Sequence, residues 1–372
     1  MNDKSKDPLK ELRISSPHNL ILYRAGRDFQ GNFARDGIIS AILMQDAEML
    51  QQQLLFCAER QGKKRNPFNG EEPGKIFHED QGMIINGLST KYNACDASAL
   101  FLIGHENYQR MTGDSNLARS QKTEIEAAVE NIRRHIRKDG AFVEDPNFSG
   151  NERFALNVTY WKDSELPDRE NGQPSYPVIY PLAHIQNMRA LKSVSSLLKG
   201  IDLDEEISRM RDYLTSQLFD EEKGLFYLAI DSKGPISAVS SDSLHALFYL
   251  DREDITENQL ERIVASSKIL ETLWGYRSLS EEDSKKVKDP YHAKTLWIFE
   301  QAMISVGARK FDLGHVEEVS SRTGTYLKTI PDMNPEILDL NGEGMENAGN
   351  DPQLWTIAAR DYFNNHQTGI FP

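Results

Sequence analysis

The sequence lacks the features that mark membrane proteins and disulfide-stabilised proteins. Among its 372 residues only Cys57 and Cys95 are cysteines, which is too few for a disulfide framework and suits a reducing cytoplasm. No stretch approaches the roughly 20 apolar residues that a membrane-spanning helix needs. The first residues, MNDKSKDPLKELR, contain no apolar core of a secretion signal. We therefore expect a cytoplasmic protein with no membrane partner.

Basic residues are also scarce. Lys and Arg number 43 against 57 Asp and Glu, so the formal charge is 43 − 57 = −14. Nucleic-acid binding requires clustered cations, and the longest basic run is only Lys63–Lys64–Arg65. We therefore expect no nucleic-acid partner.

Motifs that hold metals or organic cofactors are missing as well. The sequence has no HExxH, no CxxC, no phosphate-binding loop, no dinucleotide fingerprint and no GxSxG. His78 lies beside Glu79 in GKIFHED, but no second His stands at ligand spacing. The sequence predicts no metal site and no cofactor.

What the sequence does contain is helical periodicity. Apolar residues recur at three- and four-residue steps through RDGIISAILMQDAEMLQQQLLFCAER, which we interpret as one long helix, and through YNACDASALFLIGHENYQRMTG and DSNLARSQKTEIEAAVENIRRHIRKDG. Further helical patterns lie near 176–198, 204–217, 240–249, 258–270, 290–306, 314–321 and 352–363, about ten in all. GLFYLAIDSKGPIS alternates with a period of two and predicts a short β-hairpin.

The loops between these helices alternate in length. Long loops rich in Gly, Pro, Asn and Asp cover 62–91, 140–175, 277–290 and 328–351. Their recurrence after every second helix predicts stacked helical hairpins whose functional loops gather on one face. The length allows two domains or one large closed toroid or barrel. Because no linker divides the chain, we predict a single domain over residues 1–372.

Two carboxylates on these loops are candidate catalysts. Asp163 follows an indole in TYWKDS, and packing against Trp161 would remove water from the carboxyl and raise its pKa, as a general acid requires. Lys162 would oppose that shift if it pointed inward. The alternative to a catalytic role is that Asp163 is an ordinary exposed residue of the loop. Glu336 lies just before a later helix. Paired carboxylates with aromatic platforms equip a protein for glycoside hydrolysis, although a sugar-binding module remains an alternative.

Other polar residues have both a functional and a structural interpretation. Arg35 and Asp36 in FARDG would grip sugar hydroxyls, or Asp36 would simply stabilise a helix start. YNACDAS has the same two interpretations: its polar residues would contact the sugar, or they would cap a helix. In PYHAKTLWIFEQAM, much of the apolar stripe is expected in the core.

Taken in order, the motifs FARDGI, GKIFHE, YNACDAS, YWKDS with HIQNMRAL, SSDSLHALF, YHAKTLWIFEQAMISVG and PEILD…PQLWTIAA resemble those of (α/α)6-toroid glycoside hydrolases. The amylo-α-1,6-glucosidase domain of glycogen-debranching enzymes and its bacterial relatives are the most similar. The resemblance runs from about Asn32 to Phe363. It implies an all-α, (α/α)6 fold of twelve helices and an inverting mechanism without a metal or cofactor.

The resemblance also implies roles for individual residues. Asp163 would be the general acid and Glu336 the general base. The residues expected to contact the sugar are Arg35, Asp36, His78, Glu79, Tyr92, Asn93, Asp96, Trp161, Lys162, Tyr291, His292 and Trp297.

The motifs depart from the debranching pattern at positions that bear on the substrate. Val158, Thr159 and Tyr160 stand where a Gly is common, and Phe77 replaces a common Pro. We predict an inverting hydrolase of short α-linked gluco-oligosaccharides or α-glucosides. The alternatives are another small α-glycoside, such as an α-mannoside or a sugar–glycerate conjugate, and a non-catalytic carbohydrate-binding protein. The sequence leaves the oligomeric state open.

Overall fold

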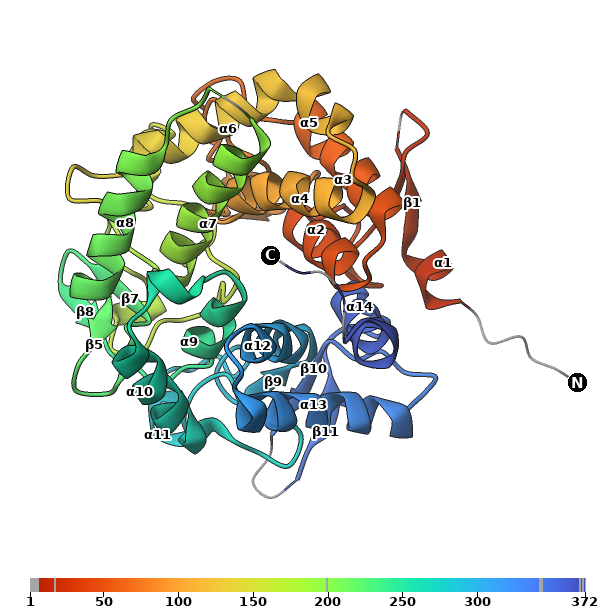
Figure 1. The fold of residues 1–372 in the computed structure, drawn as a ribbon, viewed down its shortest axis with the longest axis vertical. Helices are drawn as coiled ribbons and strands as arrows, with labels where there is room; N and C mark the ends of the chain where they lie inside the picture. Colours follow the sequence, from red (N-terminus) through yellow and green to blue (C-terminus); the bar gives the residue numbers. More distant parts are fainter. Residues whose placement is uncertain are drawn as a thin grey trace, which may run out of the picture.

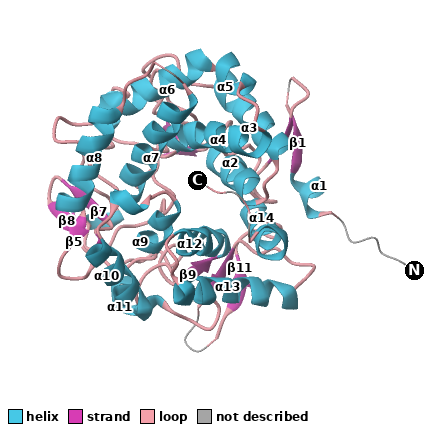
Figure 2. Cartoon of the chain, viewed as in Figure 1, coloured by secondary structure: helices cyan, strands magenta, loops and turns pink. Residues whose placement is uncertain are grey.

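The computed structural model describes residues 7–16, 18–198, 200–340, 344–367, 369 and 371. Viewed down its shortest axis, the chain forms a ring of helices in two concentric layers (Figure 1, Figure 2). The inner layer consists of α2 (Ala34–Leu43), α4 (Ala97–Thr112), α7 (Pro181–Leu197), α9 (Asp242–His245) continued by η3 (Ala246–Phe248), α12 (Ile298–Lys310) and α14 (Leu354–Asp361). Each inner helix contacts the next, and α14 contacts α2, so the ring is closed.

The outer helices pack on the inner ones. The outer helices, in chain order, are α1 (Pro8–Leu12), α3 (Ala47–Glu59), α6 (Lys122–His135), α8 (Asp204–Gln217), α10 (Glu257–Ser267) and α13 (Gly314–Thr329). The short helices α5 (Asn116–Ser120) and α11 (Glu281–Ser284) lie in connections. The described residues therefore make six helical pairs, and the predicted (α/α)6 toroid is confirmed. No helix in the described part of the chain is both long and apolar enough to cross a membrane.

The two layers differ in burial. All ten residues of α2 are buried, whereas α8 buries only Ile207, Met210 and Leu214. An inner helix is covered by its neighbours and by its outer partner, so it has no solvent face and needs no polar stripe. Buried positions therefore occur all round α2, whereas α8 is buried along one side only.

Several predicted helix bounds are wrong. The segment interpreted as one long first helix is α2 and α3, which are separated at Met44–Asp46, where Gln45 has a φ of 51°. The helix expected from Pro290 begins at Ile298, because Thr295–Trp297 form strand β9. The split of the first segment, together with the unpredicted α1, accounts for the two helices missing from the sequence count.

Short strands of two or three residues lie in the segments between the helices. The predicted hairpin is β7 (Ala229–Asp231) with β8 (Gly234–Ile236); it follows the pair β5 (Phe219–Asp220) and β6 (Leu225–Phe226). Two more pairs are β1 (Arg13–Ser15) with β2 (Ile21–Tyr23) and β3 (Ile84–Ile85) with β4 (Leu88–Ser89). A sheet of order β11 (Glu346–Ala348), β10 (Ile337–Asp339), β9 sets Ile337 opposite Trp297. This register brings Glu336 next to the segment that contains Tyr291 and His292.

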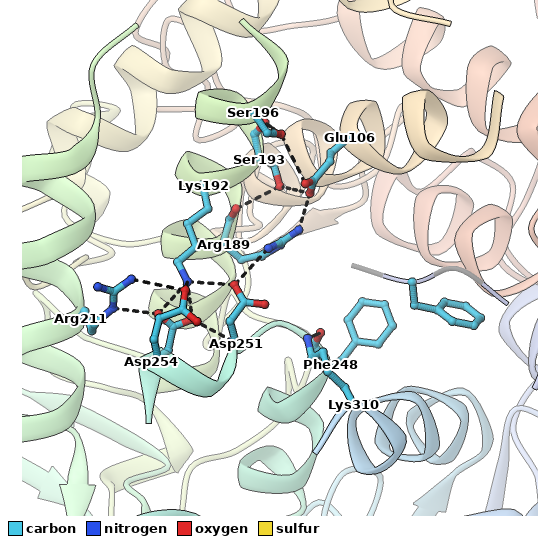
Figure 3. A network of polar contacts seen from close by, with 12 residues as sticks. Glu106, Arg189, Lys192, Ser193, Ser196, Arg211, Phe248, Asp251, Asp254 and Lys310 are labelled. Carbon is cyan, nitrogen blue, oxygen red and sulfur yellow. Dashed lines mark hydrogen bonds and ion pairs between the residues drawn. The ribbon is translucent and has the colours of Figure 1, made fainter. Parts of the chain in front are cut away.

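The C-terminal halves of the inner helices are held by ion pairs (Figure 3). Lys192 on α7 contacts Asp254 at 2.6 Å and Asp251 at 2.9 Å, just after η3. Arg189, one turn earlier, contacts Glu106 on α4 at 2.5 Å. The network fixes three neighbouring inner elements to one another at this end of the ring.

A buried charge cluster joins the loop before α4 to the loop before α7. Lys75 Nζ lies 3.1 Å from Glu72 Oε1 and 3.3 Å from Glu144 Oε1, and all three side chains are at most 2% exposed. His135 Nε2 lies 2.8 Å from Glu72 Oε2. Removing one partner of such a cluster leaves charge buried without compensation.

We expect Lys75→Met to lower the free energy of unfolding by about 3–5 kcal/mol, because it strands two buried carboxylates. Urea unfolding followed by circular dichroism measures the change. The matched control is Arg209→Met, which breaks the exposed pair Arg209–Glu205 and should cost at most about 1 kcal/mol. Equal unfolding midpoints for Lys75→Met and wild type would contradict the importance of the cluster.

Candidate active site

A cavity of about 370 Å³ lies at the end of the ring where the inner helices begin. Its wall is made by Ala25, Phe29, Phe33, Arg35, Asp36, His78, Trp161, Asp163, Tyr291, His292, Trp297, Glu336, Gln353 and Trp355. Nine of these fourteen residues were predicted from the sequence. A larger hollow of about 1400 Å³, beside Leu273 and Trp274 on the flank of the ring, contains none of the predicted residues.

Asp163 reaches the cavity from the long loop before α7. Its side chain is partly exposed to the cavity, but the surrounding protein removes much of its hydration. Burial raises the pKa of Asp163 to about 7, Arg35 opposes the shift, and Asp96 and Glu336 add to it. An Asp with this pKa holds its proton through much of the range in which a general acid is useful.

Glu336 comes from a much later part of the chain, just before β10, and is only 4% exposed. Gln353 Nε2 donates to Oε1 at 2.8 Å, Asn350 N donates to Oε2 at 3.1 Å, and the Tyr291 hydroxyl also donates to this carboxylate. Gly349 makes the approach possible: its φ is +75°, and a Cβ there would collide with Glu336 Oε2. The carboxylate is therefore held in one orientation.

A third carboxyl, Asp36, comes from the first turn of α2. Burial, together with Glu336 and Asp163, raises the pKa of Asp36 well above its usual range, against the lowering effect of Arg35. Arg35 itself makes two hydrogen bonds of 2.9 Å to Asp96, one from Nε and one from Nη2. The cationic side chain of the wall is thus already committed to a buried carboxylate.

The other polar groups of the wall are neutral. Burial lowers the pKa of His78 to about 3, with a further contribution from Arg35. Burial likewise lowers the pKa of His292 well below its usual range, and its ring stacks on Trp297 at a centroid distance of 4.6 Å. Within the described residues, His78 Nδ1 and Trp355 Nε1 have no hydrogen-bond partner. Both residues belong to the cavity wall.

Five residues predicted to contact substrate do not line the cavity. Glu79 accepts a hydrogen bond from Thr90, and the Tyr92 hydroxyl donates to the Arg60 carbonyl at 2.8 Å. Asn93 accepts from the backbone N–H of Ala155 at 2.8 Å.

Asp96 and Lys162 complete this group. Asp96 binds Arg35, as described above, and Lys162 Nζ contacts Asp242 at 3.0 Å and Ser240 at 2.8 Å. All five side chains serve the structure around the cavity. The Lys162 ammonium group is bound to Asp242 and is therefore not directed at Asp163.

Sequence reasoning missed Ala25, Phe29, Phe33, Gln353 and Trp355 as wall residues. Gln353 and Trp355 lie in the PQLW stretch that was already quoted as a motif, so the motif itself was the available signal. Phe29 and Phe33 pack edge to face at 5.1 Å ahead of α2. Nothing in their local sequence distinguishes them from core aromatics.

Two clusters in the described chain bring three possible metal ligands together. They are Asp242, His245 and Glu300, and Asp251, Glu253 and Asp254. In each cluster a lysine ammonium already contacts at least one of the acids: Lys162 at Asp242 and Lys192 at Asp254. The absence of a metal stays a prediction.

Solved structures share this fold. No protein-family model matches the chain, and no curated protein matches it in sequence. The GH63 mannosylglycerate hydrolase from Thermus thermophilus in complex with glucose has a TM-score of 0.67 at 14% identity, covering 97% of this chain and 99% of that one. The neutral trehalase of Saccharomyces cerevisiae has a TM-score of 0.64 at 11% identity, over 95% and 77%. A rhamnosidase from Klebsiella oxytoca with rhamnose bound has a TM-score of 0.58 at 14% identity, over 94% and 60%.

The raised pKa of Asp163 predicts a pH-dependent stability difference. Between an unfolded pKa of about 3.9 and the folded pKa of about 7, the folded protein binds the extra proton, so wild type loses stability as the pH rises. Asp163→Asn does not titrate, so its advantage over wild type should grow across this window and stay constant above it. Thermal unfolding at a series of pH values measures the difference.

The control for that experiment has the opposite sign. Burial opposes the shift, but Arg169 and backbone donors lower the pKa of Asp231, so its stabilising effect is present above the unfolded pKa and lost as the pH falls. Asp231→Asn should therefore be less stable than wild type at neutral pH. A constant difference between Asp163→Asn and wild type at every pH would contradict the raised pKa.

Proposed function

We propose that this protein is an inverting glycoside hydrolase, with Asp163 as general acid and Glu336 as general base. The observation that supports this most is the pair of unlike carboxyls in one cavity. Asp163 has a pKa of about 7 and no cationic partner within 4.0 Å among the described residues, whereas Glu336 is held by several hydrogen-bond donors. Two carboxyls in different environments are the equipment for acid and base roles in glycoside cleavage.

In the proposed reaction, Asp163 gives its proton to the glycosidic oxygen as the bond to the anomeric carbon breaks. Glu336 takes a proton from a water molecule, whose oxygen attacks the anomeric carbon from the other face of the sugar. The α-configured bond is replaced by a β-configured hydroxyl. Afterwards Asp163 is ionised and Glu336 is protonated, and exchange with solvent restores both groups.

The proposed substrate is a short α-linked gluco-oligosaccharide or an α-glucoside. The free space in the cavity is small, which favours binding and release of a single terminal sugar. Trp161, Trp297 and Trp355 provide aromatic wall surface. Charge supports a neutral ligand, because the wall contains three carboxyls and Arg35 is already bound to Asp96.

A sugar–glycerate conjugate is the second candidate. It is favoured by the likeness to the mannosylglycerate hydrolase, which covers nearly the full length of both chains. The charge of the wall weighs against it, since the glycerate carboxylate would enter beside Asp36 and Asp163 without a free cation among the wall residues. The two candidates are therefore distinguished by the charge of the leaving group.

Proton NMR of sugar release tests the proposal. Wild type is incubated with a panel of α-glucosides, α-mannosides and a mannosylglycerate, and the anomeric signal of the first product is recorded. We expect β-configured sugar from an α-glucoside, and a fall of at least about 100-fold in kcat for Asp163→Asn and for Glu336→Gln. The rate should also fall above about pH 7, where Asp163 loses its proton.

Tyr92→Phe is the matched control, because Tyr92 belongs to a quoted motif but its hydroxyl bonds to Arg60 outside the cavity. This variant should keep its activity. Hydrolysis that survives both carboxyl substitutions would refute the assignment of acid and base. Saturable shifts on adding sugar, without turnover of any substrate, would favour the non-catalytic carbohydrate-binding alternative.

A further inference from the structure

Asp242, at the start of α9, binds all three residues that precede Asp163. Its Oδ2 accepts a hydrogen bond from the Tyr160 hydroxyl at 3.0 Å, and its Oδ1 accepts one from Trp161 Nε1 at 2.9 Å. Lys162 Nζ lies 3.0 Å from the same Oδ1. Asp242 is 7% exposed, so these contacts are made away from bulk water.

The position of Asp242 is itself fixed. The neighbouring Ser241 hydroxyl donates to Glu300 Oε1 on α12 at 2.8 Å. Tyr160 also stacks on Tyr180, the residue before α7, at a centroid distance of 4.7 Å. The irregular segment that ends in Asp163 is thus fastened to the first turns of inner helices.

The Lys162 ammonium group is enclosed by polar partners. This group donates to Ser240 Oγ at 2.8 Å, Ser241 Oγ at 3.0 Å and the Ser278 carbonyl at 3.2 Å. Among the described residues, Asp242 is its only carboxylate within 4.0 Å. The charge of Asp242 therefore compensates a buried cation that stands next to the proposed general acid in the sequence.

We infer that Asp242 is a positioning residue for Asp163: it anchors the three preceding residues and neutralises Lys162 beside the cavity. The inference rests on the proposed function for its catalytic consequence. Asp242 does not touch the cavity, so it acts through Trp161 and Lys162. Misplacing a catalytic group by about 1 Å is enough to slow an enzyme about 100-fold.

The pH dependence involves every titratable or charged group around Asp163. These groups are Arg35 and Asp36 from α2, Asp96 before α4, the neutral Tyr291 and His292 before α12, Glu336 before α14, and Lys162, which precedes Asp163 in the chain and is bound to Asp242. In Asp242→Asn all of them remain, but Lys162 loses its counter-charge. An uncompensated cation favours the ionised form of a nearby carboxyl.

The experiment compares kcat, KM and the pH profile of Asp242→Asn with wild type. We expect kcat to fall by about 10- to 100-fold, KM to change little, and the alkaline limb to move down by about 1 pH unit. Adding Lys162→Met to Asp242→Asn removes the uncompensated charge and should return the limb towards its wild-type position. The matched control is Asp231→Asn, a carboxylate of equal exposure outside the cavity, which should leave the limb unchanged.

A second measurement does not depend on hydrolysis. The indole N–H of Trp161 donates to Asp242, and Trp161 lines the same cavity as Asp163, so its NMR resonance should titrate with Asp163 in wild type. In Asp242→Asn this resonance should shift, and the midpoint of its titration should fall. If wild type hydrolyses nothing but the midpoint still falls, the proposed function fails and the positioning role stands.

An unchanged pH limb and an unchanged titration midpoint in Asp242→Asn would overturn the inference, whatever the effect on stability. Should that variant not fold, Tyr160→Phe removes one of the three anchors more gently. It should lower kcat in the same direction by a smaller factor, with the fold intact by circular dichroism. Wild-type kcat in a folded Tyr160→Phe would then count against the anchor.

Discussion

The structure depends on one geometric constraint: the six inner helices in the described chain begin at the same end of a closed ring. The residues at their starts meet there, as Arg35 of α2 with Asp96 before α4 and Asp242 of α9 with Trp161 show. Helix N-termini carry unsatisfied N–H groups and a partial positive charge, which favours carboxylates nearby. The ring therefore collects acids from distant segments into one small volume.

The two cations in and beside that volume are each paired with a buried acid. Arg35 is paired with Asp96 and Lys162 with Asp242, so neither cation is free to hold Asp163 in its ionised form. Asp163 is left in a poorly hydrated cavity with other carboxyls, and its pKa rises to about 7. Buried pairs that look purely structural thus influence the protonation of Asp163.

The polar residues of the quoted motifs divide into two groups by tertiary position. Arg35, Asp36, His78, Asp163, Tyr291, His292 and Glu336 line the cavity, while Glu79, Tyr92, Asn93, Asp96 and Lys162 hold the segments around it. Both groups carry the same residue types in similar loops and helix starts. Local sequence contains no information about which way such a side chain points.

The sequence by itself determined the helical layers, the loops on one face and the motifs that supply the cavity, because apolar periodicity and turn residues act locally. It could not separate α2 from α3, because the apolar spacing of the sequence continues across the turn at Gln45. Only the tertiary structure decided that Asp242 binds Trp161 and Lys162, some eighty positions away. Ring closure creates such contacts, and it also removes the water that would otherwise keep Asp163 an ordinary carboxylate.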